Sequence, residues 1–133
     1  MIAAFADTSY YLALFNENDL RHDEAERFSR NADRSIVLSE FIILELGNAF
    51  CRGHARRMFV ELVEDLRHDP LCRIIPASPD LLEAGLRLYA RRPDKEWSLT
   101  DCISFVVMEQ HGLTDALTGD HHFEQAGFKI LLK

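Results

Sequence analysis

Five short apolar segments, separated by helical patterns, constrain the fold of this chain more than any other feature of its sequence. Such runs are typical of strands that are buried on both faces of a sheet. They cover residues 2–6, 35–38, 72–75, 113–118 and 128–132. Between them, apolar residues recur at helical spacing, as in Phe59, Leu62, Val63 and Leu66. This alternation predicts an α/β fold, a three-layer α/β/α sandwich with a central, mainly parallel sheet.

Length and composition are those of an ordinary folded protein. The 133 residues fit one domain, which we expect to span residues 1–133. No segment reaches the roughly 20 consecutive apolar residues of a membrane span, and the N-terminal segment lacks the basic start of a signal peptide. We therefore expect a cytoplasmic location and no membrane partner. We expect the three cysteines to be small core side chains that form neither disulfides nor a zinc site; they are Cys51, Cys72 and Cys102.

Four acidic residues stand where a parallel sheet would bring them together. Asp7 follows the first strand directly and Asp120 lies two residues beyond the fourth, so both are expected at the carboxyl edge of the sheet. Asp101 lies in the first turn of a helix that begins near Ser98, and Glu45 lies inside the most apolar helix, which we expect to be buried. A buried carboxylate is costly unless it is paired or binds a metal ion. Such a cluster favours a hard cation, Mg²⁺ or Mn²⁺.

Each of these acids also has a structural explanation. Asp101 can form a capping box with Ser98, and Glu45 can pair with an arginine or reach solvent along a narrow polar stripe. Asp7 can be a turn residue at its strand end, and Asp120 can close an Asx turn. Each explanation accounts for one acid, but together they do not explain why four acids converge on one edge of the sheet. The residues therefore favour metal-dependent phosphodiester chemistry.

The net charge of −7 counts mildly against a nucleic-acid substrate, because nucleic-acid-binding proteins usually present a basic face. A carboxylate cluster accounts for part of the excess, and local basic stretches remain. The densest follows the helix that carries Glu45 and contains Arg52, Arg56 and Arg57. It can guide phosphates toward the acids, or it can be a solvated loop between helices. A second basic loop, over residues 91–95, leaves the same two readings open.

Three segments resemble the PIN-domain family, most of all the small stand-alone proteins that include the VapC toxins of bacterial toxin–antitoxin pairs. They are ADTSYYLALF (6–15), LSEFIILELGNAF (38–50) and WSLTDCISFVVMEQHGLTDALTGDHHFEQAGFKIL (97–131). The resemblance covers nearly the whole chain in the expected order. It implies a parallel-sheet α/β/α fold and an Mg²⁺- or Mn²⁺-dependent endoribonuclease.

The resemblance also implies roles for individual residues and partners. It assigns the family's catalytic, metal-binding acids to Asp7, Glu45, Asp101 and Asp120. Among them, we expect Asp7 and Asp101 to hold the principal ion. Thr8 falls at the hydroxyl position after the first acid, and we expect it to contact the RNA substrate. Relatives of this kind cleave RNA, form homodimers and are inhibited by an antitoxin. The implied partners are therefore an RNA substrate, a second copy of the chain and a cognate antitoxin protein.

Two other functions fit parts of the sequence. A PIN-like module that binds RNA or protein without catalysis shares the fold, although the four intact acids count against it. A receiver-type phosphoacceptor domain shares the size and the strand–helix alternation. It would need an acidic pair after the first strand, where Asp7 stands alone before Thr8 and Ser9.

Overall fold

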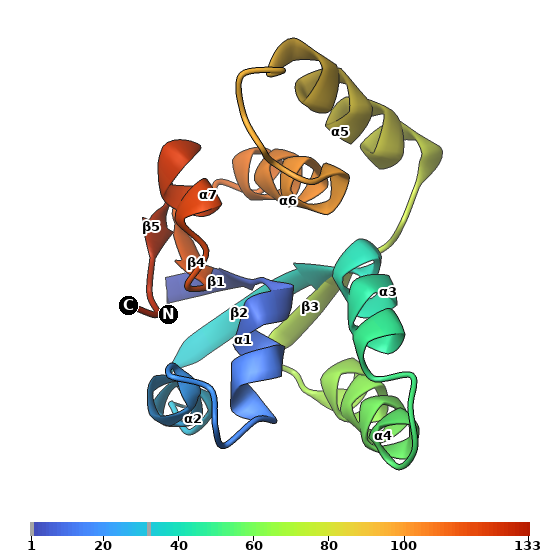
Figure 1. The fold of residues 1–133 in the computed structure, drawn as a ribbon, viewed down its shortest axis with the longest axis vertical. Coiled ribbons are helices and arrows are strands. Elements are labelled where there is room, and N and C mark those ends of the chain that lie inside the picture. Colours follow the sequence, from blue (N-terminus) through green and yellow to red (C-terminus); the bar gives the residue numbers. More distant parts are fainter. Residues whose placement is uncertain (1, 32) are drawn as a thin grey trace.

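A five-stranded sheet forms the centre of the computed structural model, which describes residues 2–31 and 33–133 (Figure 1). Neighbouring strands are all parallel, in the order β3-β2-β1-β4-β5. The strands are β1 (Ile2–Ala6), β2 (Arg34–Ser39), β3 (Cys72–Ile75), β4 (Asp115–Leu117) and β5 (Lys129–Ile130). The predicted α/β fold is confirmed, and each strand lies at its predicted place. The order differs from the 2-1-3-4-5 order of receiver-type proteins.

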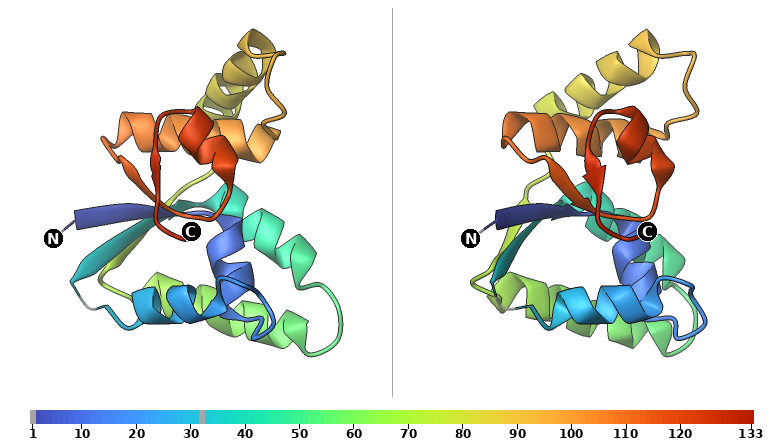
Figure 2. Two further views of the ribbon diagram at one scale, coloured as in Figure 1. Left: turned by 60° about the vertical axis from the view of Figure 1, so that its left-hand side comes forward. Right: turned by 90° about the vertical axis from the view of Figure 1, so that its left-hand side faces the viewer.

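Helices cover both faces of this sheet, as the sequence predicts. The helices are α1 (Thr8–Leu14), α2 (His22–Ser29), α3 (Glu40–Ala49), α4 (Ala55–His68), α5 (Pro79–Arg91), α6 (Leu99–Gln110) and α7 (His121–Gln125). Figures 1 and 2 show α1, α2 and α4 on one face and α6 and α7 on the other, with α5 outside α6. Among the described helices, none is both long and apolar enough to cross a membrane.

Serine residues define the starts of three helices. The Ser39 hydroxyl accepts the N–H of Ile42 at the start of α3, and the Ser78 hydroxyl accepts that of Leu81 at the start of α5. Ser98 caps α6. These side chains satisfy backbone donors that the first turn of a helix leaves free. The carboxyl edge of the sheet therefore has well-defined helix starts around it.

The most apolar helix, α3, is less buried than its sequence predicts. Only Ile42 and Leu46 are buried, and Leu44 is 63% exposed. The prediction of a buried helix is wrong because α3 begins at the carboxyl end of β2 and continues beyond the sheet, beside α1 (Figure 1). Cys51, just past its end, is also exposed, whereas Cys102 is buried in α6 as expected.

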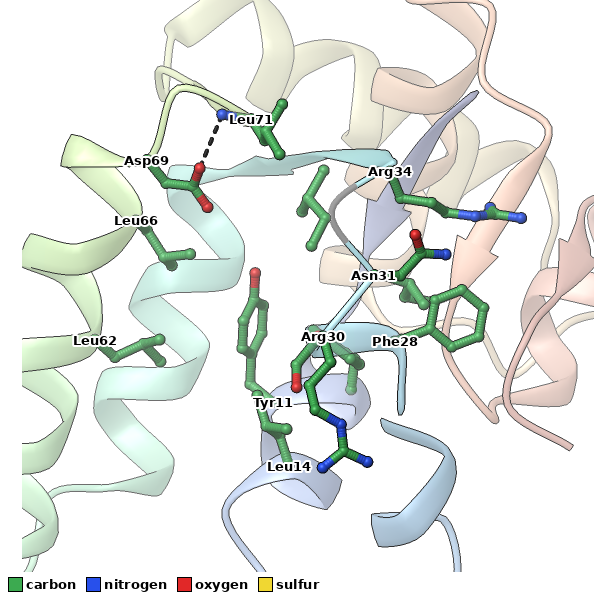
Figure 3. A pocket seen from close by; sticks show the side chains of 14 residues that line it. Tyr11, Leu14, Phe28, Arg30, Asn31, Arg34, Leu62, Leu66, Asp69 and Leu71 are labelled. Carbon is green, nitrogen blue, oxygen red and sulfur yellow. Dashed lines mark hydrogen bonds between the residues drawn. The ribbon is translucent and has the colours of Figure 1, made fainter. Parts of the chain in front are cut away.

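A pocket of about 270 Å³, open on one side, lies on the face of α1, α2 and α4. Figure 3 shows Tyr11 of α1 standing in it, between the leucines of α4 and residues at the end of α2. The Tyr11 side chain is 2% exposed, and its hydroxyl has no hydrogen-bond partner among the described residues. Burial raises the pKa of Tyr11 well above its usual value. The packing of this face therefore leaves one polar group unsatisfied.

Candidate active site

The four predicted acids line one open depression of about 350 Å³ at the carboxyl edge of the sheet. The chain reverses direction across the sheet between β1 and β4, so this edge is a topological switch point, where open parallel sheets bind ligands. The two strand ends are joined where the N–H of Asp7 donates to the carbonyl of Leu117 at 3.2 Å. The depression is lined by Asp7, Thr8, Ser9, Leu12, Glu45, Glu96, Ser98, Asp101, Asp120 and His122.

Asp7 is the most buried acid of this depression, at 6% exposure. Its Oδ2 accepts hydrogen bonds from the hydroxyls of Thr118 at 2.8 Å and Ser9 at 3.1 Å. Burial raises the pKa of Asp7 to about 6, and the negative charge of Asp101 adds to the rise, while the Thr118 hydrogen bond opposes it. A cation bound beside this carboxylate would lower the pKa of Asp7, because it stabilises the charged form.

Asp101 has both roles that the sequence left open. It forms the predicted capping box, because its N–H donates to the Ser98 hydroxyl at 3.0 Å and its Oδ2 accepts the Ser98 N–H at 3.1 Å. The same carboxylate lines the acidic depression. Burial raises its pKa, and the charge of Asp120 adds to the rise. The capping box thus holds a buried acid at the site.

Asp120 and His122 form the side of the depression that belongs to α7. The Asp120 carboxylate caps α7 by accepting the N–H of His122 at 2.9 Å. The His122 ring returns toward the acids, with Nδ1 at 3.2 Å from Oδ2 of Asp101 and 3.3 Å from Oδ1 of Asp120. His122 therefore lies between two of the predicted metal ligands.

Glu45 lies across the depression, on α3. It is half-buried, and its carboxylate accepts a hydrogen bond from the hydroxyl of Thr8. Within the described residues no arginine or lysine lies within 4.0 Å of it, so the alternative of a structural ion pair does not hold. Thr8 orients Glu45 in this structure, and its contact with an RNA substrate stays a prediction.

The residues of the depression suit a divalent cation. They offer carboxylate and hydroxyl oxygens, which hard cations prefer. The negative charge of Asp101 raises the pKa of Asp7, and that of Asp120 raises the pKa of Asp101, so a bound cation would relieve this repulsion. Asp120, His121 and His122 also bring ligand atoms within 4.8 Å of one another.

The three arginines predicted to guide phosphates do not line this depression. Arg52 is exposed in the loop before α4, Arg56 donates to the carbonyl of Cys51 at 3.0 Å, and Arg57 pairs with Glu61 at 3.6 Å. In Figure 1 this loop lies at the far end of α3 from the strand ends. A role for these arginines in binding RNA stays a prediction.

Sequence reasoning missed several residues of the site, chiefly Ser9, Thr118 and Glu96. Thr118 connects the acids: its hydroxyl donates to Asp7 and accepts the N–H of Asp120 at 3.0 Å. Its position at the end of a buried strand, next to the switch point, is the signal that could have found it. Glu96 precedes the α6 start and brings a fifth carboxylate to the rim, which no pattern in the sequence marks.

Comparison with known proteins gives a family match over most of the chain. The family model described as PIN domain matches residues 4–129. The 23S rRNA-specific endonuclease VapC20 from two Mycobacterium tuberculosis strains is 30% identical over 124 residues, which are 93% of this chain and 94% of the relative.

Solved structures give the same fold. The crystal structure of M. tuberculosis VapC20, described as a sarcin–ricin loop cleaving toxin, has a TM-score of 0.83 at 29% identity and covers 94% of this chain and 95% of its own. FitAcB from Neisseria gonorrhoeae has a TM-score of 0.65 at 24% identity, with 98% and 96% covered. VapBC2 from Rickettsia felis, bound to a promoter DNA fragment, has a TM-score of 0.66 at 11% identity, with 97% of each chain covered. The last two likenesses show the fold alone.

Proposed function

Because this chain belongs to the PIN-domain family, we propose that it is a metal-dependent endoribonuclease of the VapC toxin type. One observation carries the proposal. Three acids at helix starts and Glu45 within α3 line a single depression, and the pKa values of Asp7 and Asp101 are raised by burial and by neighbouring negative charge. Buried carboxylates this close together repel one another in the absence of a cation, and together they can bind one.

In this proposal the acids divide the work of binding. Asp7 and Asp101 are the principal ligands of the cation, and Glu45 and Asp120 complete its shell or help to hold a second ion. A bound Mg²⁺ or Mn²⁺ supplies an activated water and offsets negative charge on the phosphate. Thr118, Ser9 and Thr8 fix the carboxylates from behind, and the capping box with Ser98 fixes Asp101.

The relatives suggest the substrate and the partners. VapC20 cleaves 23S rRNA, and an rRNA stem-loop is therefore the first RNA to test with this chain. We also propose a cognate antitoxin protein, since VapC20 is described as a toxin. A homodimer is the third proposed partnership. It is supported by apolar side chains exposed on two helices, Leu44 on α3 and Leu82 on α5.

An RNA cleavage assay tests the activity directly. Purified protein should cleave a long RNA in Mg²⁺ or Mn²⁺ and should fail to do so in EDTA. Asp7→Asn and Asp101→Asn should reduce cleavage to the level of the EDTA control while leaving the circular dichroism spectrum unchanged. Full activity in either variant would contradict the proposed site. A folded wild-type chain that neither binds the cation nor cleaves RNA would favour the binding module without catalysis.

A further inference from the structure

We propose that a hollow next to the acidic depression binds one nucleotide of the RNA that flanks the cleaved phosphate, an inference that rests on the proposed ribonuclease function. This hollow, called here the Trp97 hollow, has a volume of about 670 Å³. It lies between the end of α5 and the start of α6. The residues that line it include Tyr89, Arg92, Lys95, Glu96, Trp97 and Ser98.

The Trp97 hollow adjoins the acidic depression. Glu96 and Ser98 line both of them, and Ser98 also holds Asp101 through the capping box. A strand of RNA whose phosphate lies over the carboxylates would therefore place its neighbouring nucleotide at this hollow. Its volume falls within the range of about 300–1,000 Å³ that is usual for small-ligand sites.

The hollow provides positive charge, which the acidic depression lacks. Arg92 and Lys95 both lie over the Trp97 ring, with Cζ and Nζ at 5.2 Å and 5.9 Å from its centroid. Arg92 is neutralised, because Asp94 accepts its Nε and Nη2 hydrogens at 3.0 Å and 2.9 Å, and this contact holds the pKa of Asp94 at about 2. Lys95 has no carboxylate within 4.0 Å among residues 2–31 and 33–133. Its charge is therefore available to an RNA phosphate.

An exposed aromatic ring provides the second contact. Tyr89 is 53% exposed at the rim of the hollow. Bases stack on such rings whatever their identity. Trp97 itself is 6% exposed and its Nε1 donates to Gln125 at 3.0 Å, so it serves as a fixed floor that positions the two cations. Lys95 and Tyr89 can therefore bind one nucleotide together, with the phosphate on the Lys95 ammonium and the base stacked on the Tyr89 ring.

Binding of a short RNA without cleavage tests the inference. Fluorescence anisotropy with a fluorescein-labelled single-stranded RNA of mixed sequence is measured in EDTA, so that no substrate is cut. Lys95→Ala should weaken binding about fivefold and reduce the salt dependence by about one phosphate contact. Tyr89→Ala should weaken it about tenfold, and Tyr89→Phe, which keeps the ring, should not. Asp94→Asn should strengthen binding, because it frees Arg92 from its carboxylate.

A neighbouring arginine provides the matched control. Arg91 ends α5 and does not line the hollow, so Arg91→Ala should leave affinity nearly unchanged. Equal losses in Arg91→Ala and Lys95→Ala would overturn the inference, as would unchanged binding in Lys95→Ala and Tyr89→Ala, or wild-type protein that does not bind the RNA. Cleavage in Mg²⁺ is scored separately on the same variants. If the wild type cleaves RNA in Mg²⁺ but the Lys95 and Tyr89 variants bind RNA as the wild type does, only the proposed nucleotide site is wrong. If these variants bind RNA more weakly but the wild type does not cleave it, only the proposed nuclease activity is wrong.

Discussion

The buried charge of Asp7 lowers the stability of the metal-free fold, although the proposed metal site uses this carboxylate as a ligand. It is nearly buried at the switch point of the sheet, and two hydroxyls hold its carboxylate there. Its raised pKa means that the folded protein without a cation binds a proton more tightly than the unfolded chain. The free energy of unfolding contributed by this group therefore falls as pH rises from about 4 to about 6, and the loss is complete above the folded pKa.

Asp7→Asn should therefore stabilise the metal-free protein. The amide keeps an oxygen for Ser9 and Thr118 but carries no charge to bury. At pH 7.5 in EDTA, the free energy of unfolding should rise by up to roughly 3 kcal/mol, the value of the shift from 3.8 to about 6. Urea unfolding at a series of pH values measures this.

The exposed Asp65 of α4 provides the control for this measurement. Asp65→Asn should leave the free energy of unfolding and its pH dependence nearly as in the wild type. The difference between Asp7→Asn and wild type should shrink below pH 6 and vanish near pH 4. A difference that stays constant with pH would show that the burial of the Asp7 charge is not its source.

At the scale of elements, α1 connects the site to the core. Its first residue, Thr8, orients Glu45, and one turn later Tyr11 enters the pocket between α2 and α4 (Figure 3). A buried hydroxyl without a partner costs about 1–3 kcal/mol, whereas phenylalanine has the same ring and no polar group. Tyr11 therefore lowers the stability of the fold at a position that does not line the acidic depression.

Tyr11→Phe should raise the free energy of unfolding by about 1 kcal/mol and leave RNA cleavage unchanged. Thermal and urea unfolding followed by circular dichroism measure the change. Tyr89 is 53% exposed, so Tyr89→Phe is the matched control and should not alter stability. A less stable Tyr11→Phe protein would mean that the hydroxyl is bridged by a water in the pocket.

At the scale of the whole molecule, the proposed homodimer explains apolar side chains that the single chain leaves in solvent. Light scattering after size-exclusion chromatography should give a mass of about twice 15.3 kDa. Leu44→Glu or Leu82→Glu should shift it toward the monomer, because a buried charge at an interface is costly. Leu20→Glu, on an exposed loop, should leave the mass unchanged. A monomeric wild-type protein would contradict the homodimer.

The fold and the shared position of three of the four acids could be predicted from the sequence by itself. Strand period, helix starts such as Ser98 and the rule that parallel strands share a carboxyl edge are local signals. They suffice to bring Asp7, Asp101 and Asp120 to one place before any coordinates are known. The residues favoured metal-dependent phosphodiester chemistry, and the family resemblance narrowed this to an endoribonuclease.

Only the tertiary structure decided how buried each acid is and what holds it. The sequence made Glu45 appear the most buried, since its helix is apolar all round, but α3 lies beyond the sheet and Asp7 is the buried acid instead. Likewise, the contacts of Thr118 with Asp7 and of His122 with Asp101 join residues that are 111 and 21 positions apart. Burial and such contacts depend on how elements pack, and no local pattern in a sequence records that.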